Sequence, residues 1–76
     1  MFEELDTVVL AHDIGKYGLK RGDVGVVVHV YENGKAIEVE FVNAEGKTVA
    51  LLTLSPNDIR SIARNEIFHV RGFNTA

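Results

Sequence analysis

Residues 20–41 constrain the fold of this chain more than any other part of the sequence. A glycine-containing turn at Gly22-Asp23 leads into the apolar run Val24–Tyr31, and the dipeptide Asn33-Gly34 separates that run from a second one. Asn-Gly between two apolar runs is a strong hairpin signal, because both residues accept the positive φ angles of a type I′ turn. The stretch therefore predicts a turn, a long strand, a tight hairpin and a second strand.

The two predicted strands differ in pattern. Residues 36–42 alternate, which places Ile37, Val39 and Phe41 inward and Glu38 and Glu40 toward water. Residues 26–28, in contrast, are valine on both faces, as expected of a strongly bent strand shared between two packed sheets. A glycine near the start of that strand permits the bend or a bulge.

The remaining segments complete a small β-domain. We predict a strand within residues 5–11 with Leu5 facing the core, a glycine-rich loop at 12–22 that is too polar for a helix, a strand at 48–54 and a closing strand at 59–62. Ser55-Pro56 predicts the start of one short 3-10 turn. The expected core consists of Val9 or its neighbours, Leu19, Val27, Val30, Ile37, Val39, Phe41, Leu52, Leu54 and Ile59.

Composition excludes several classes of protein. Seventy-six residues make one domain with a marginal core, and the absence of cysteine excludes disulfides and thiolate metal sites. The formal net charge is −3, whereas a nucleic-acid binder normally shows a basic surplus. The acidic N-terminus is unlike a signal peptide, and no apolar run approaches a membrane span. We expect a cytoplasmic domain without cofactor, metal or membrane contact.

The order of strand, long loop, three-stranded meander, 3-10 turn and short strand is that of an SH3-like barrel. Residues 22–27, Gly-Asp-Val-Gly-Val-Val, resemble the turn and strand of KOW-type barrels. A closer resemblance, over about residues 2–62, is to the bacterial domain-of-unknown-function family DUF4926. It rests on Phe2-x-x-Leu5-Asp6-x-Val8-Val9-Leu10, Asp13-Ile14, Gly18-Leu19-x-x-Gly22-Asp23-Val24-Gly25-x-Val27-Val28-His29-Val30-Tyr31, Glu38-Val39-Glu40-Phe41-Val42 and Leu54-x-x-x-Asp58-Ile59-Arg60. The resemblance implies a small bacterial protein of no established activity, with an association to toxin–antitoxin or defence loci.

Several polar residues that could take part in catalysis or binding are expected to have structural roles instead. His12-Asp13 could act as an acid–base pair, but neighbours in extended chain point to opposite sides, so Asp13 is expected to bond nearby amides. Asp23 is expected to fix its turn rather than bind a partner's cation. We therefore predict no catalytic residues and a protein that is not an enzyme.

Surface charges are likewise expected to pair within the chain. Glu38 and Glu40 would form a solvated sheet face opposite Lys47 or His29. Asp58 and Arg60 would form an exposed ion pair at the 3-10 turn.

Partner binding is assigned to aromatic and apolar residues outside the core. The segment 63–76 extends a barrel that looks complete over 1–62, yet it carries four large apolar residues that a frayed tail would not keep exposed. We expect a protein-binding or assembly module, with self-association through 67–73 into a homo-oligomer; the alternative is a KOW-like nucleic-acid binder. The candidate binding residues are Tyr17, Tyr31, Ile67, Phe68, Val70 and Phe73.

Overall fold

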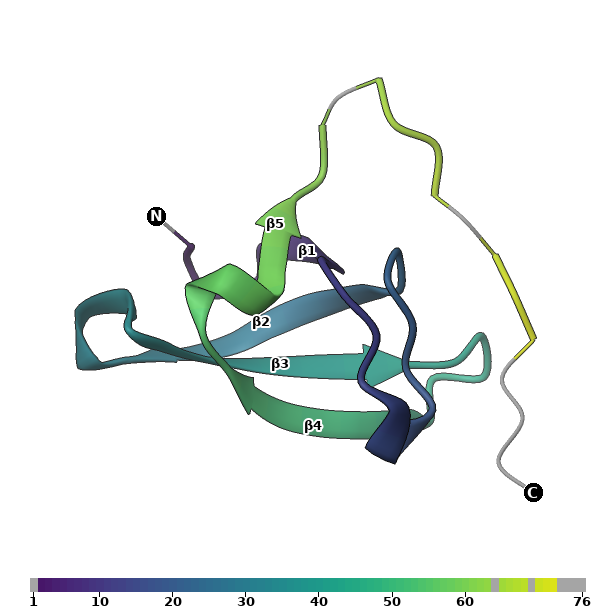
Figure 1. Cartoon of the computed structure of the whole chain (residues 1–76), viewed down its shortest axis with the longest axis horizontal. Coiled ribbons are helices and arrows are strands. Elements are labelled where there is room, and N and C mark those ends of the chain that lie inside the picture. The colour runs from purple at the N-terminus through teal and green to yellow at the C-terminus, as the bar shows by residue number, and fades with distance from the viewer. Residues whose placement is uncertain (1, 64, 69, 73–76) are drawn as a thin grey trace.

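The structure is a computed structural model that describes residues 2–63, 65–68 and 70–72. These residues form one antiparallel sheet of five strands in the order β4-β3-β2-β1-β5 (Figure 1). The strands are β1 (Thr7–Leu10), β2 (Val24–Tyr31), β3 (Ala36–Val42), β4 (Thr48–Leu54) and β5 (Ile59–Ser61). The predicted all-β class is confirmed, and the SH3-like barrel stays an interpretation of this element order.

The valine run predicted a strand shared between two packed sheets, whereas the described strands form one sheet in which β2 pairs with a strand on each side. Its first residues pair with β1, with Val24 opposite Val9, and its later residues pair with β3, ending with Tyr31 opposite Ala36. The register of the β2–β3 ladder shifts between Val27 and His29. The shift interrupts the alternation of burial along β2, because Gly25 and Val27 are buried while the next two residues, Val28 and His29, are both exposed.

Gly25 lies where β2 crosses the core. A Cβ atom there would lie 2.7 Å from Cγ1 of Val39 and 2.9 Å from the ring of Phe41. Both neighbours are buried residues of β3. The glycine is thus required by close packing at the bend.

The β2–β3 hairpin contains the predicted positive φ angles. Asn33 has φ 57° and Gly34 has φ 95°, and the N–H of Lys35 donates to the carbonyl of Glu32 at 3.2 Å. Glu32 is also left-handed, with φ 50°, which the dipeptide did not predict. Residues Glu32–Gly34 therefore form a left-handed 3-10 turn, labelled η2.

Two further single turns flank the sheet, so the structure has three 3-10 turns where one was predicted. The predicted turn is η3 (Pro56–Asp58), in which the Asp58 carboxylate accepts from the N–H and hydroxyl of Ser55 at 2.9 and 3.2 Å. The unpredicted one is η1 (Gly15–Tyr17), which an isolated bridge between Ile14 and Leu19 closes.

The core takes side chains from all five strands and from Leu19 of the loop before β2. Most of the predicted residues belong to it; Val30, Leu52 and Leu54 are only partly buried, and Ala50 was missed. Leu5 was wrongly assigned, since its side chain is 82% exposed and its φ is 74°. A turn precedes β1 there, and the N–H of Leu5 donates to the carbonyl of Val27 instead. The buried residues are Val8, Val9, Leu10, Leu19, Val27, Ile37, Val39, Phe41, Ala50 and Ile59.

Candidate functional site

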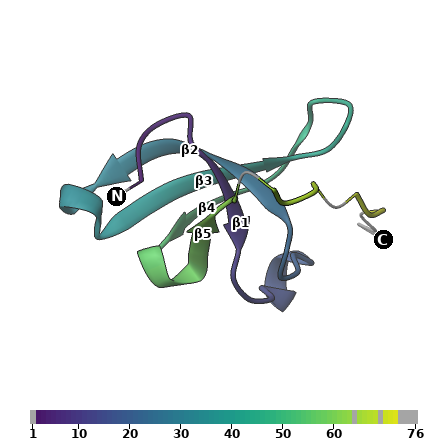
Figure 2. The same ribbon diagram turned by 90° about the horizontal axis from the view of Figure 1, so that it is seen from above.

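The C-terminal segment leaves the sheet after β5 and returns to it at a distant point. Figures 1 and 2 show it running from β5 toward the end of the sheet that carries the β3–β4 hairpin. Its described residues form no strand or helix. Two ion pairs fasten it to the folded domain, one at each end.

The first ion pair joins Arg60 of β5 to Glu66. Nη1 and Nη2 of Arg60 donate to Oε1 and Oε2 of Glu66, both at 2.8 Å, and the N–H of Ala63 also donates to Oε1, at 2.6 Å. The hydrogen bonds from Arg60 and then from Ala63 hold the pKa of Glu66 below its ordinary value. A two-pronged contact of this kind fixes orientation as well as distance.

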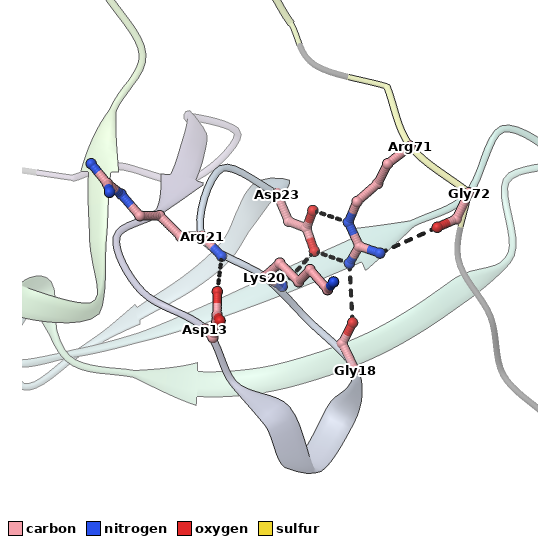
Figure 3. A network of polar contacts seen from close by, with 7 residues as sticks. All are labelled: Asp13, Gly18, Lys20, Arg21, Asp23, Arg71 and Gly72. Atoms are coloured by element: carbon pink, nitrogen blue, oxygen red, sulfur yellow. Dashed lines mark hydrogen bonds and ion pairs between the residues drawn. The ribbon is translucent and has the colours of Figure 1, made fainter.

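The second ion pair joins Arg71 to Asp23, at the glycine turn before β2 (Figure 3). Nε of Arg71 donates to Oδ1 of Asp23 at 2.7 Å, and Nη2 donates to Oδ2 at 2.5 Å. Nη2 also donates to the carbonyl of Gly18 at 3.0 Å. We call the Asp23 carboxylate and the Gly18 carbonyl the acidic socket. Its carboxylate is well covered, with 16% of the Asp23 side chain exposed.

Hydrogen bonds within the loop that do not involve Arg71 also position the acidic socket. The N–H of Lys20 donates to Oδ2 of Asp23 at 2.8 Å, as predicted for a turn-fixing aspartate. The N–H of Arg21 donates to Asp13 at 2.7 Å, which confirms the amide-bonding role of that residue. Burial favours the neutral form of Asp23, but the hydrogen bonds from Arg71 and from Lys20 outweigh it and lower the pKa.

Between the two ion pairs lie the side chains that we call the displayed triad, Ile67, Phe68 and Val70. They are 92, 57 and 89% exposed. The sequence analysis assigned all three to partner binding, and the structure places them together on one segment. Phe73, assigned with them, lies outside the described residues.

A groove of about 650 Å³ lies between this segment and the sheet. Its floor is apolar, with Leu19, Phe41 and Val49, and its rim carries Glu45 and Lys47 of the β3–β4 hairpin. Val70 and Arg71 line it from the side of the C-terminal segment. The site thus combines an apolar groove with an acidic socket.

The two predicted tyrosines lie at different places. Tyr17 is on η1, one residue before Gly18 of the acidic socket, and is 42% exposed with Nζ of Lys16 5.6 Å from its ring centre. Tyr31 ends β2 at the hairpin opposite the C-terminal segment (Figure 1), where its hydroxyl donates to Glu38 at 3.1 Å. The structure therefore brings Tyr17 close to the site and leaves Tyr31 away from it.

One predicted surface pairing is wrong and one is confirmed in part. Asp58 does not pair with Arg60, because its carboxylate folds back onto Ser55 and meets His12, while Arg60 reaches Glu66. Glu38 lies opposite His29 in the register of β2 and β3, as predicted. Among the described residues, Glu38 accepts from Tyr31 and Glu40 accepts from the Thr48 hydroxyl at 2.6 Å.

His12 and Asp58 form a further pair of titratable groups, away from the C-terminal segment. Nε2 of His12 lies 2.7 Å from Oδ1 of Asp58, and Nδ1 lies 3.0 Å from the carbonyl of Asp13. The hydrogen bond to Asp58 and then that to Asp13 raise the pKa of His12, and the same contact with His12 lowers the pKa of Asp58. The Ser55 hydroxyl contacts Asp58 rather than the imidazole, so the three do not form a nucleophile with its base.

No group of three or more His, Asp or Glu side chains that could hold a metal occurs in the described ranges. Nor does the part of the chain that the structure describes contain a helix of the length and apolarity needed to cross a membrane.

These features define a small five-stranded all-β domain with a C-terminal segment clasped to its glycine turn. The model of the family described as domain of unknown function DUF4926 matches residues 4–61, and the chain belongs to this family. No curated protein and no solved structure matches the chain. The matched residues include Asp23 and Arg60. The match ends before Glu66, the partner of Arg60, and before Arg71, the partner of Asp23.

The sequence analysis missed both ion pairs and therefore the acidic socket. One signal was present: Glu66 and Arg71 are charged residues that bracket the displayed triad. Their partners lie elsewhere in the sequence, and nothing local indicates which charges they meet.

Proposed function

We propose that this protein is a non-enzymatic protein-binding or assembly module that acts through the displayed triad and self-associates. The observation that carries the proposal is the fastening of the segment at both ends by two-pronged ion pairs, while three large apolar side chains between them stay mostly in water. Exposed apolar groups on a positioned segment are typical of protein-interaction sites.

The ion pairs favour binding by ordering the segment in advance. A free tail would lose conformational entropy on association, at about 0.5–1.5 kcal/mol for each immobilised long side chain. Residues 66–71 already have part of that order, because Arg60 and Asp23 fix their two ends. Full burial of a side chain such as Ile67 or Phe68 contributes about 1.5–3 kcal/mol, so a partner that covers the triad would gain several times RT.

The KOW-like nucleic-acid module ranks second. Its phosphate contacts would need a set of basic side chains on one face. Arg60 and Arg71 each meet a carboxylate of the chain itself, and the net charge is −3. A cytoplasmic location, and a role at a toxin–antitoxin or defence locus suggested by the family resemblance, are further parts of the proposal.

Light scattering of three forms of the chain tests the proposal. We expect the intact chain to be a dimer or larger, and a chain ending at Ala63 to be a monomer. The matched variant replaces the displayed triad by serine and keeps Glu66 and Arg71; it should be monomeric, with the melting temperature that the wild-type chain has at dilutions where it is also a monomer. Equal masses for all three forms would contradict self-association, and salt-dependent binding of a short RNA would favour the alternative.

A further inference from the structure

The acidic socket has the chemistry of a complete guanidinium site. An arginine side chain offers a planar fork of N–H donors, which matches a carboxylate in a two-pronged contact. In the structure the Asp23 carboxylate accepts two hydrogen bonds from the Arg71 guanidinium, and the carbonyl of Gly18 accepts a third. Val70, the residue before the arginine, is among the residues that line the neighbouring groove, yet it stays 89% exposed.

The arginine that fills the socket belongs to a segment with little of its apolar surface buried. Ile67 and Val70 are 92 and 89% exposed although Arg71 is anchored beside them. Anchoring within one chain therefore satisfies the charges and leaves the apolar side chains in water. A second copy could cover them, because two such segments brought together would shield each other's triads.

The segment is also long enough to reach a neighbouring molecule. Exchange requires the ion pair between Arg60 and Glu66 to open, and from Ser61 to Arg71 the chain then advances ten residues. An extended chain of that length spans at most about 33–36 Å. The longest dimension of the molecule is 36 Å, so the segment can reach across to an adjoining copy.

We propose that two copies of this protein exchange their C-terminal segments, so that Arg71 of each occupies the acidic socket of the other. This inference rests on the proposed self-association and names both its partner and its contact. Exchange keeps the hydrogen bonds between Arg71 and Asp23. It also brings the two displayed triads into contact, so that each shields the other from water. Reciprocal exchange of an identical element closes a symmetric dimer without a new binding surface.

Two charge-reversed chains test the exchange. Asp23→Lys gives a basic socket with a wild-type segment, and Arg71→Glu gives an acidic segment with a wild-type socket. Each alone puts like charges together, and we expect its dimer to dissociate on the order of tenfold or more readily than wild type. Mixed in equal amounts, the two chains match at both sockets. Native mass spectrometry should then show the heterodimer in clear excess over either homodimer.

Two control variants separate folding and net charge from socket binding. Asp23→Asn keeps an oxygen for the N–H of Lys20 while removing the charge, so it should weaken the dimer without disturbing the turn. Glu32→Lys makes the same change in net charge as Asp23→Lys, but in η2 at the opposite hairpin. We expect it to dimerise like wild type.

The outcomes separate this inference from the proposed function. If both reversed chains and their mixture dimerise like wild type, the exchange is wrong while self-association stands. If the wild-type chain is a monomer even at high concentration, the exchange and self-association are both wrong. Selective formation of the heterodimer supports the exchange when each reversed chain alone also dimerises more weakly than wild type, because charge reversal by itself favours pairing between the two mixed chains.

Discussion

The sheet and the C-terminal segment place their apolar residues in opposite ways. In the sheet, residues such as Val27, Ile37 and Phe41 are almost wholly buried, and polar groups serve the turns. In the segment, the large apolar side chains face water, and the ion pairs of Arg60 and Arg71 hold the chain. The sheet is therefore stabilised by burial, whereas the segment is positioned by charge and leaves its apolar side chains exposed.

The largest expected effect comes from removing an equivalent side chain in each region. Phe41→Ala empties a site that is 3% exposed and should cost about 3–5 kcal/mol of unfolding free energy, enough to unfold most of so small a domain. Phe68→Ala removes a ring that is 57% exposed and should change the unfolding free energy by less than about 0.5 kcal/mol at concentrations where the wild-type chain is a monomer. Urea unfolding of both variants measures the difference, and similar midpoints for the two would contradict this division of the molecule.

A smaller contrast is expected from adding one methyl group to a glycine in each region. Gly25→Ala would bring a Cβ within 2.7 Å of Val39, and the repacking should cost about 1–3 kcal/mol. Gly72→Ala meets no atom within 4 Å in the segment and should leave the unfolding free energy within about 0.5 kcal/mol of wild type. Thermal unfolding of both variants in the same buffer measures the difference. An unchanged melting temperature for Gly25→Ala would show that the bend of β2 can accommodate a Cβ atom.

The sheet was predictable because its signals are local. The strands at 24–31, 36–42 and 48–54 have the bounds that their side-chain pattern predicted, since alternation and turn residues act over a few positions. Leu5 failed because a left-handed backbone before β1 interrupts the alternation. The left-handed Glu32 gave no sequence signal, because glutamate is not a residue that favours positive φ.

The site was predictable only in part. The apolar residues of the segment stand out in the sequence, and three of them make up the displayed triad. The acidic socket depends on Asp23 and Arg71, which are 48 residues apart, and no local pattern relates them. The pairing of Asp58 with Arg60 failed for a related reason. The carboxylate of Asp58 is used by its own turn and by His12, 46 residues away.

The smallest expected effect concerns pH, and it also separates the two regions. Both ion pairs of the segment join arginine to a carboxylate, and arginine keeps its charge at every pH that proteins tolerate. The pair of His12 and Asp58, which ties the loop before η1 to η3, contains a group that titrates near neutrality. The ion pairs that hold the segment should therefore be insensitive to pH between about 6 and 8. In the same range the sheet domain loses the ion pair of His12 and Asp58, because His12 loses its proton.

The sign of the effect follows from the two shifts. The pKa of His12 is raised above 6.5, so its contribution to stability is complete below that pH and is lost as the pH rises through the folded-state pKa. The pKa of Asp58 is lowered below 3.8, so its contribution is complete above that pH and is lost on acidification through the lowered pKa. The pair should stabilise the fold most between these limits.

Titration of the His12 ring protons by NMR checks this directly. Asp58→Asn removes the charge that raises the His12 pKa, which should fall toward 6.5, with the bond to the carbonyl of Asp13 keeping part of the shift. Glu66→Gln breaks the ion pair with Arg60 and should leave the His12 titration where it was, since the two contacts share no residue. The same His12 pKa in wild type and Asp58→Asn would mean that the 2.7 Å contact contributes little in solution. A shift caused by Glu66→Gln would mean that the segment and the sheet domain are coupled more closely than burial and charge indicate.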